Sequence, residues 1–224
     1  YQEIAWQAGP GIAPDGERPP NVIVIVADDL GFNDISFFGG GVAGGRVQTP
    51  NIDALAREGV SVDNAYAANA TCSPSRAAIM TGRYPTRFGF EFTGAPQAFA
   101  RYSSHSSPDA LRQSIFHEDR TADMPPLERL GVPASEVTIA EVLQARGYHT
   151  LHIGKWHLGH LPEYLPGRHG FDTWFGLPYS HDMDLTVPRD KGTDTVAYYE
   201  PRPEYFNVPL MRGEAIVERP ADHR

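Results

Sequence analysis

The sequence has 224 residues, of which 41% are hydrophobic and 21% charged, and its formal net charge is −9. These proportions are ordinary for a globular protein, and the acidic charge argues against a general nucleic-acid-binding protein, which would show a basic face. The charge does not exclude an anionic small substrate, because a few converging cations can form a local positive site. The longest apolar run, residues 22–27, is too short to span a membrane, so we expect no membrane span.

The N-terminal part of the sequence predicts an arm followed by a buried strand. Residues 1–20 are rich in glycine and proline and lack periodicity, so we interpret them as an arm that precedes the main domain, residues 21–224. The β-branched run NVIVIVA, residues 21–27, predicts a central parallel strand that is buried on both faces.

The segment TPNIDALAREGV predicts a helix with clear boundaries. Thr49 is the expected N-cap and Pro50 the first helical residue, and Gly59 provides the stop. Ile52 and Leu55 begin the apolar stripe by which we expect this helix to pack.

The next predicted elements surround the single cysteine. Residues 60–67 are expected to form a strand, and the cysteine segment is expected to lead into a helix that has Cys72 and Ser73 at its N-terminal end and is closed by Gly82. Residues 91–135 are polar and irregular. A stretch of that length is too long for an ordinary connection, so we interpret it as a functional loop or insertion near the site.

A helix and a strand are predicted after this loop. Thr138 and Glu141 form a capping box, which predicts a helix that runs to Arg146 and stops at Gly147. The segment YHTLHIG, residues 148–154, then predicts another strand. Alternation of strands and helices implies a parallel sheet covered by helices.

Asp28 and Asp29 come directly after the first predicted strand. Two adjacent carboxylates at the end of a buried strand are costly unless they are paired or bound to a cation, and hard divalent ions prefer such oxygen ligands. The pair also fits a solvated turn. From these residues alone, a metal site and a turn both stay open.

Cys72 is the only cysteine, and it begins the segment CSPSRAAIMTGR. Pro74 favours a first helical turn, which places Cys72 where backbone N–H groups and the helix dipole favour negative charge. Arg76 follows four residues later and faces the same side of the helix. Position 72 is therefore suited to an anion or an oxyanion, although a lone cysteine is also a common small core residue.

The stretch CSPSRAAIMTGRYPTRFG resembles the sulfatase signature, which has the form Cys-x-Pro-Ser-Arg followed by Thr-Gly-Arg. NVIVIVADDLG, TPNIDALAREGV, GYHTLHIGKWHLG and GFDTWFGLPYSHD are similar to successive sulfatase segments in the family's order, so the likeness covers most of residues 21–185. It implies an α/β fold of the alkaline-phosphatase type, a mixed, mostly parallel sheet sandwiched by helices. The C-terminal part of that fold is absent from this sequence.

The resemblance implies that a formylglycine-generating enzyme converts Cys72 to formylglycine. One hydroxyl of the hydrated aldehyde attacks the sulfur of a sulfate ester and the alcohol departs, and deprotonation of the other hydroxyl then expels sulfate. The implied reaction is hydrolysis of a small-molecule or saccharide sulfate ester. The family's usual settings are the periplasm, the lysosome or outside the cell.

The resemblance also implies a metal site. Asp28 and Asp29 match the family's metal-binding pair, and residue 72 is a further ligand. The expected ion is Ca²⁺, with Mg²⁺ as the other candidate. It would lower the pKa of the diol and hold a sulfate oxygen.

Four more residues receive roles from the resemblance. Arg76 matches the arginine that holds the modified residue and the metal site in place. Lys155 is expected to bind sulfate, and His157 is expected to hydrogen-bond the diol or to act as an acid or base. Because the two residues are two apart on an extended stretch, they would point to the same side. Ser180 matches a serine that contacts the substrate.

The other histidines and two of the tryptophans need no catalytic role. Trp156 and Trp174 are expected to pack in the core, and His181 is ambiguous because it neighbours Ser180. Ordinary strand or loop positions are expected for His105, His117, His149, His152, His160 and His169.

The sequence lacks motifs that complete a sulfatase site. Sulfatases are considerably longer, and their later half supplies a second pair of metal ligands and a further Lys and His, whereas residues 186–224 resemble none of these. Strand-like patches at residues 195–199 and 214–218 are followed by no closing element. We therefore expect the remaining half of the fold from sequence absent here or from another chain, and little activity from these residues alone.

Two other functions stay open. A phosphonate or phosphodiester hydrolase of the same superfamily can use the same cysteine motif on a substrate of the same tetrahedral geometry but different charge. A non-catalytic binding module would keep the fold and leave Cys72 as a free thiol.

Overall fold

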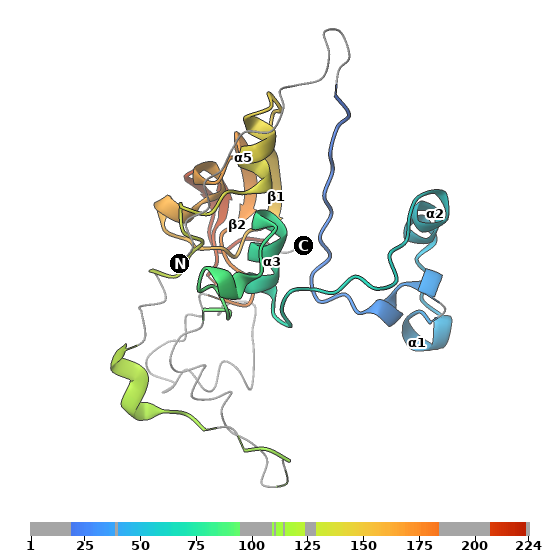
Figure 1. Ribbon diagram of the computed structural model, residues 1–224, viewed down its shortest axis with the longest axis horizontal. Coiled ribbons are helices and arrows are strands. Elements are labelled where there is room, and N and C mark those ends of the chain that lie inside the picture. Colours follow the sequence, from blue (N-terminus) through green and yellow to red (C-terminus); the bar gives the residue numbers. More distant parts are fainter. Residues whose placement is uncertain are drawn as a thin grey trace. The chain divides into compact units, whose positions relative to one another are not determined.

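The computed structural model describes residues 19–38, 40–94, 109, 111–113, 115–123, 129–183 and 207–222. The chain divides into two compact units, one of residues Ala13–Ala67 and one formed mainly by Ala68–Arg224 (Figure 1). Nearly all of the expected N-terminal arm and the strand predicted at residues 195–199 lie outside the described residues. No described helix is long and apolar enough to cross a membrane.

The smaller unit is built from short helices, which are η1 (Phe32–Asp34), η2 (Ser36–Phe38), α1 (Val42–Gly45) and α2 (Pro50–Glu58). The predicted boundaries of α2 are confirmed, with Thr49 as N-cap, Pro50 as the first residue and Gly59 as C-cap. The predicted apolar stripe is wrong, because Ile52 and Leu55 are exposed and Asp53 is the residue that α2 buries.

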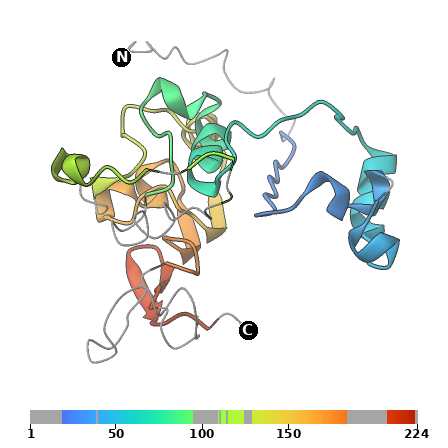
Figure 2. The same ribbon diagram turned by 90° about the horizontal axis from the view of Figure 1, so that it is seen from below.

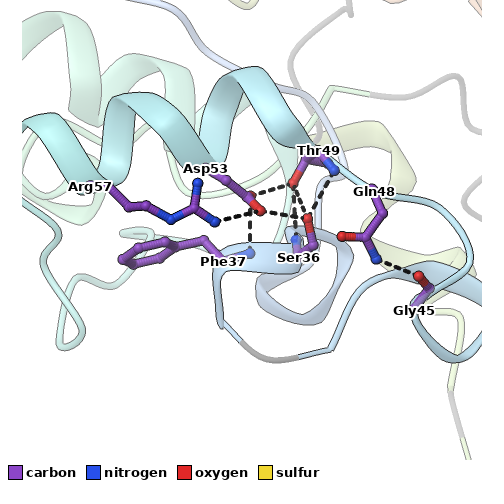
Figure 3. Close-up of polar contacts among 7 residues, drawn as sticks. All are labelled: Ser36, Phe37, Gly45, Gln48, Thr49, Asp53 and Arg57. Atoms are coloured by element: carbon purple, nitrogen blue, oxygen red, sulfur yellow. Dashed lines mark hydrogen bonds and ion pairs between the residues drawn. The ribbon is translucent and has the colours of Figure 1, made fainter.

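Asp53 joins α2 to η2 through a cluster of hydrogen bonds (Figure 3). Its carboxylate accepts from the Ser36 hydroxyl at 2.8 Å and from the Thr49 hydroxyl at 2.7 Å. It also accepts the Phe37 N–H at 3.0 Å and lies 3.6 Å from the Arg57 guanidinium. Apolar periodicity cannot predict this contact, because a buried carboxylate is stable only where the folded chain supplies such donors.

Two strands predicted in this unit are absent from its described residues. Residues 21–27 and 60–67 have no strand assignment, and their side chains are exposed, with Ile25 at 84% and Val60 at 90%. A β-branched run takes on strand structure when a neighbouring strand supplies ladder hydrogen bonds. The sheet in the described part of the chain includes neither segment, so their β-propensity alone does not produce a strand.

The described part of the larger unit contains a four-stranded sheet of order β1 (Leu151–Lys155), β2 (Thr173–Leu177), β3 (Leu210–Arg212) and β4 (Ala215–Glu218). β1 and β2 are parallel, with Lys155 opposite Leu177, whereas β2–β3 and β3–β4 are antiparallel. The segment that contains β3 and β4 is coloured red in Figure 2. The sequence predicted β1 and β4. It missed β2 and β3.

Two α-helices of this unit begin where the sequence predicts. α3 (Cys72–Thr81) is closed by Gly82 in the left-handed conformation, with φ +66°. α5 (Ile139–Gln144) has the predicted capping box, in which the Glu141 N–H donates to the Thr138 hydroxyl and the Glu141 carboxylate accepts the Thr138 N–H. It ends at Gln144 rather than Arg146, because the chain already turns there toward Gly147.

The short helices of this unit are η3 (Pro85–Arg87), η4 (Glu118–Asp123), η6 (Pro162–Tyr164) and η7 (Pro166–Arg168). η4 lies within the predicted loop of residues 91–135, so the described part of that loop includes helical turns. The assignment of this stretch as a functional loop stays a prediction.

The core of the larger unit lies between α3 and the segment that follows β1. Ala77 of α3 packs with Phe88, Val132, Trp156 and Leu158, and Trp156 is only 1% exposed. Its indole N–H donates to a backbone carbonyl at 2.8 Å, which satisfies the one polar atom of the ring. A second cluster contains Trp174, so the expected packing role of both tryptophans is confirmed.

We predict that Asp53→Asn loosens the contact between α2 and η2. Burial alone would raise the pKa of Asp53, but hydrogen bonds from Thr49, Ser36 and Phe37 and the Arg57 charge hold that pKa below its usual value. The stabilisation is therefore present above the ordinary carboxyl pKa and is lost as the pH falls through the lowered one. The variant lacks this charge at every pH, so the Phe37 amide should exchange faster than in the wild type, as measured by hydrogen exchange.

Glu58→Gln is the matched control, because Glu58 is an exposed acid on the same helix. It should leave exchange at the Phe37 amide unchanged. Equal acceleration in both variants would show that Asp53 has no special role.

Candidate active site

Cys72 begins α3, as the sequence predicts. The preceding turn is held by Asn69, whose side-chain oxygen accepts from the N–H and the hydroxyl of Thr71, each at 3.0 Å. The Ser75 hydroxyl donates to the Asn69 backbone carbonyl at 2.6 Å, which ties the turn to the helix. Pro74 lies buried in the first helical turn. These bonds fix the point at which the chain delivers Cys72 to the helix N-terminus.

α3 lies beside β1 (Figure 1), and three side-chain contacts join its first turns to the end of β1 and the residues after it. Sγ of Cys72 lies 3.5 Å from Nδ1 of His157. The Ser73 hydroxyl donates to the backbone carbonyl of His157, and Nη1 of Arg76 donates to the backbone carbonyl of Lys155. The structure therefore brings four of the predicted site residues together.

His157 has an unusual backbone conformation, with φ at +58° although it is not glycine. Its N–H donates to the carbonyl of Pro178 at 3.1 Å, and the Trp156 N–H donates to that of Leu177 at 2.9 Å, so the β1–β2 ladder continues past the strands. A non-glycine residue pays about 1–3 kcal/mol for such a conformation and keeps it only where its surroundings over-determine it.

The left-handed turn at His157 corrects one sequence prediction. Lys155 is the last residue of β1, but the backbone is no longer extended at His157, which is only 6% exposed. The rule that side chains two apart share one face therefore does not apply to this pair. What aims the imidazole at Cys72 is the turn together with the bond from Ser73.

Ser180 follows closely after Pro178, the residue whose carbonyl accepts the His157 N–H. It is buried and comes two residues after that proline. Its own carbonyl accepts the Met183 N–H at 3.2 Å. The contact of Ser180 with a substrate stays a prediction.

Asp28 and Asp29 belong to the smaller unit, where they form an exposed turn, and Asp29 has φ at +53°. Their carboxylate oxygens are the type of ligand that a hard divalent cation prefers, but Ca²⁺ needs about six to eight oxygen ligands, more than these two residues provide. Within the described ranges, no group of three or more His, Cys, Asp or Glu side chains could hold a metal ion. The described donors alone therefore do not make a complete site, and metal binding by the pair stays a prediction.

An open pocket lies beside His157. Ser73 and His157 line it together with Phe90, His160 and Tyr179, and the rings of His160 and Tyr179 lie 4.4 Å apart between centroids at an angle of 38°. Sequence reasoning missed this pair and Ser73. Ser73 occupies the unspecified position of the signature, and the two rings meet only because β1 and β2 end side by side.

His152 lies in β1 close to the site. Its ring is 5.2 Å from that of Trp156 and 5.3 Å from that of Phe171. Burial and the nearby Arg76 charge lower the pKa of His152 to about 4, against a smaller opposing effect of backbone hydrogen bonds. The ring is therefore neutral at neutral pH and does not repel the guanidinium that holds the end of β1.

The sulfatase family model matches residues 20–200 of this chain. The chain belongs to the sulfatase family. It is 36% identical to N-acetylgalactosamine-6-sulfatase of Homo sapiens over 209 residues, which cover 91% of this chain and 34% of that protein. It is 39% identical to arylsulfatase A of Homo sapiens over 182 residues, which cover 80% of this chain and 29% of that protein. The chain thus spans about a third of the length of these curated relatives.

Solved structures give the same family and the fold. Ps i-CgsB matches with a TM-score of 0.60 and 31% identity, covering 89% of this chain and 37% of its own. PsFucS1 sulfatase from Pseudoalteromonas sp. matches with a TM-score of 0.55 and 32% identity, covering 92% of this chain and 36% of its own. The predicted alkaline-phosphatase-like α/β fold is therefore confirmed, and the described sheet is mixed.

We predict that Ser73→Ala destabilises the site around His157. The change removes the hydrogen bond that the Ser73 hydroxyl donates to the His157 carbonyl, and this bond helps to hold the left-handed backbone of His157. The free energy of unfolding, measured by denaturant titration, should therefore fall by about 1–3 kcal/mol. Thr86→Ala, at an exposed position of η3, should shift it by less than about 0.5 kcal/mol. A Ser73→Ala protein as stable as the wild type would show that this bond does not hold the turn.

We predict that His152→Leu makes the protein less sensitive to acid. Because the pKa of His152 falls from 6.5 to about 4 on folding, the unfolded chain binds more protons than the folded chain between pH 4 and pH 6.5. Stability is therefore complete above about pH 6.5 and falls toward pH 4, by about 3 kcal/mol at most for this residue.

The free energy of unfolding, measured at several pH values, should therefore fall less in His152→Leu than in the wild type. His117→Leu is the control, since His117 is exposed, and it should keep the wild-type slope. Identical slopes in the wild type and His152→Leu would contradict the assignment.

Proposed function

We propose that the protein hydrolyses sulfate esters with a nucleophile formed from Cys72 by conversion to formylglycine. The observation that carries this proposal is the 3.5 Å approach between Sγ of Cys72 and Nδ1 of His157. Here Sγ stands in for an oxygen of the hydrated aldehyde, which conversion would place on the same Cβ. Membership of the sulfatase family supports the reaction type.

The residues around position 72 then have separate tasks. The hydrated aldehyde supplies the attacking hydroxyl, and His157 hydrogen-bonds it or moves its proton. Arg76 keeps the start of α3 on the end of β1 by its bond to the Lys155 carbonyl. The N-terminal N–H groups of α3 favour negative charge at residue 72. Lys155 binds the sulfate as a point charge, and Ser180 contacts the substrate.

We also propose that Asp28 and Asp29 bind a divalent cation, Ca²⁺ or Mg²⁺, together with residue 72. When bound, the ion supplies positive charge close to the sulfate oxygens. The kind of donor supports this role, and further ligands must come from outside the described residues.

The names of related proteins support a saccharide sulfate ester as the substrate. One relative is an N-acetylgalactosamine-6-sulfatase, and Ps i-CgsB has been solved in complex with a neocarrahexaose. The open pocket beside His157, lined also by Ser73, adjoins the residues that surround position 72.

The test combines a mass measurement with kinetics on the mature, full-length protein. After maturation with a formylglycine-generating enzyme, the peptide that contains residue 72 should have lost its sulfur. Hydrolysis of an aryl sulfate should be faster than that of the matched phosphate diester. Cys72→Ser should retain less than about one thousandth of wild-type turnover, because a serine sulfate has no second hydroxyl to release it.

Three results would contradict this proposal. A thiol at residue 72 that alkylates normally in matured, fully active protein would exclude the formylglycine nucleophile. Faster cleavage of the diester would assign the site to phosphodiester hydrolysis. A matured protein with the thiol and no hydrolysis would instead be a binding module.

A further inference from the structure

The pocket beside His157 suits the neutral part of a substrate better than its sulfate group. Among the described residues that line it, none is Lys or Arg, and Glu91 is the only carboxylate. An anion placed next to Glu91 would be repelled without a compensating cation. The charged end of a sulfate ester therefore belongs at the Ser73 and His157 end, and the pocket is left for the leaving group.

The walls of the pocket combine aromatic rings with a carboxylate. The His160 and Tyr179 rings lie 4.4 Å apart between centroids, and both are half-buried. Phe90 and Phe92 also line the pocket, and Phe92 is 54% exposed. A sugar ring presents apolar C–H faces to such rings and hydroxyl donors to a carboxylate, whereas a plain aryl ring has no donor to offer Glu91.

The ring pair is held in a fixed position relative to His157. Gly159 has φ at +115°, and a Cβ there would lie 2.5 Å from Cβ of Tyr164, so the loop between His157 and His160 packs closely against Tyr164 and leaves no room for a side chain at position 159. Tyr179 directly follows Pro178, whose carbonyl accepts the His157 N–H at 3.1 Å. Both rings are thus positioned by the same backbone that positions the imidazole.

We propose that Glu91, His160 and Tyr179 form the leaving-group subsite and select a singly sulfated, otherwise neutral sugar ring. This inference rests on the proposed sulfatase function. His160 and Tyr179 contact the sugar face, and Glu91 accepts its hydroxyls. The same carboxylate disfavours sugars that carry a second sulfate or a carboxylate, so specificity arises from repulsion as well as attraction.

The ring wall is tested by Tyr179→Ala in the mature, full-length protein, with N-acetylgalactosamine 6-sulfate as substrate. The ring contacts the leaving group in both ground state and transition state, so KM should rise about tenfold and kcat should change much less. The inhibition constant of inorganic sulfate should stay within about twofold, because sulfate alone does not reach the rings. Tyr84→Ala, at an exposed tyrosine outside the pocket lining, should match the wild type.

The selectivity is tested by Glu91→Gln with the 6-sulfate and the 4,6-disulfate of N-acetylgalactosamine. Removing one charge from the pocket wall should reduce the kcat/KM preference for the singly sulfated sugar by about fivefold. Glu163→Gln, an exposed acid on η6, should leave the preference unchanged. Glu91 is itself exposed, so this variant keeps the test available if Tyr179→Ala does not fold.

The outcomes separate this inference from the proposed function. If the wild type hydrolyses sulfate esters and both variants behave like it, the subsite is wrong and the sulfatase function stands. If the wild type hydrolyses none, the proposed function fails and the subsite fails with it. A raised KM in Tyr179→Ala with a lowered preference in Glu91→Gln supports the subsite.

Discussion

The docking of the first turns of α3 on the end of β1 is the interaction on which the site depends. It joins residues that lie about eighty positions apart in the sequence through the Ser73–His157 and Arg76–Lys155 hydrogen bonds and the approach of Cys72 to His157. The left-handed backbone at His157 costs about 1–3 kcal/mol. Burial of each large apolar side chain behind it, such as Trp156, contributes about 1.5–3 kcal/mol and offsets that strain.

The same docking separates charge from apolar surface. The N-terminus of α3 favours negative charge at residue 72, and the adjoining pocket has aromatic walls and a carboxylate. The substrate that we propose, with an anionic end and a neutral ring, would match these two regions. Because β1 and β2 run parallel and end together, residues that follow both strands can serve this one place.

Elements with local signals could be predicted from the sequence. The start of α3 at Cys72, its glycine stop and the capping box of α5 are set by neighbouring residues, and the structure has each of them. The grouping of Cys72, Arg76, Lys155 and His157 came from motif resemblance. The structure places these residues close together, and their roles stay predictions.

Features that depend on distant partners could not be predicted. The run of residues 21–27 has strong β-propensity, but strand structure needs a paired neighbour, which the described residues do not supply. Asp53 interrupts the apolar pattern of α2 because donors from η2 and Thr49 satisfy it. The His160–Tyr179 pair depends on the meeting of two loops, which neither segment encodes alone.

The most direct test of the account is a crystal structure of the matured, full-length protein at a resolution that separates the atoms on Cβ of residue 72. We predict two oxygens on that carbon, one of them within hydrogen-bonding distance of Nδ1 of His157, with the His157 backbone still left-handed. An intact sulfhydryl in active protein, or an imidazole turned away from residue 72, would contradict the central claim.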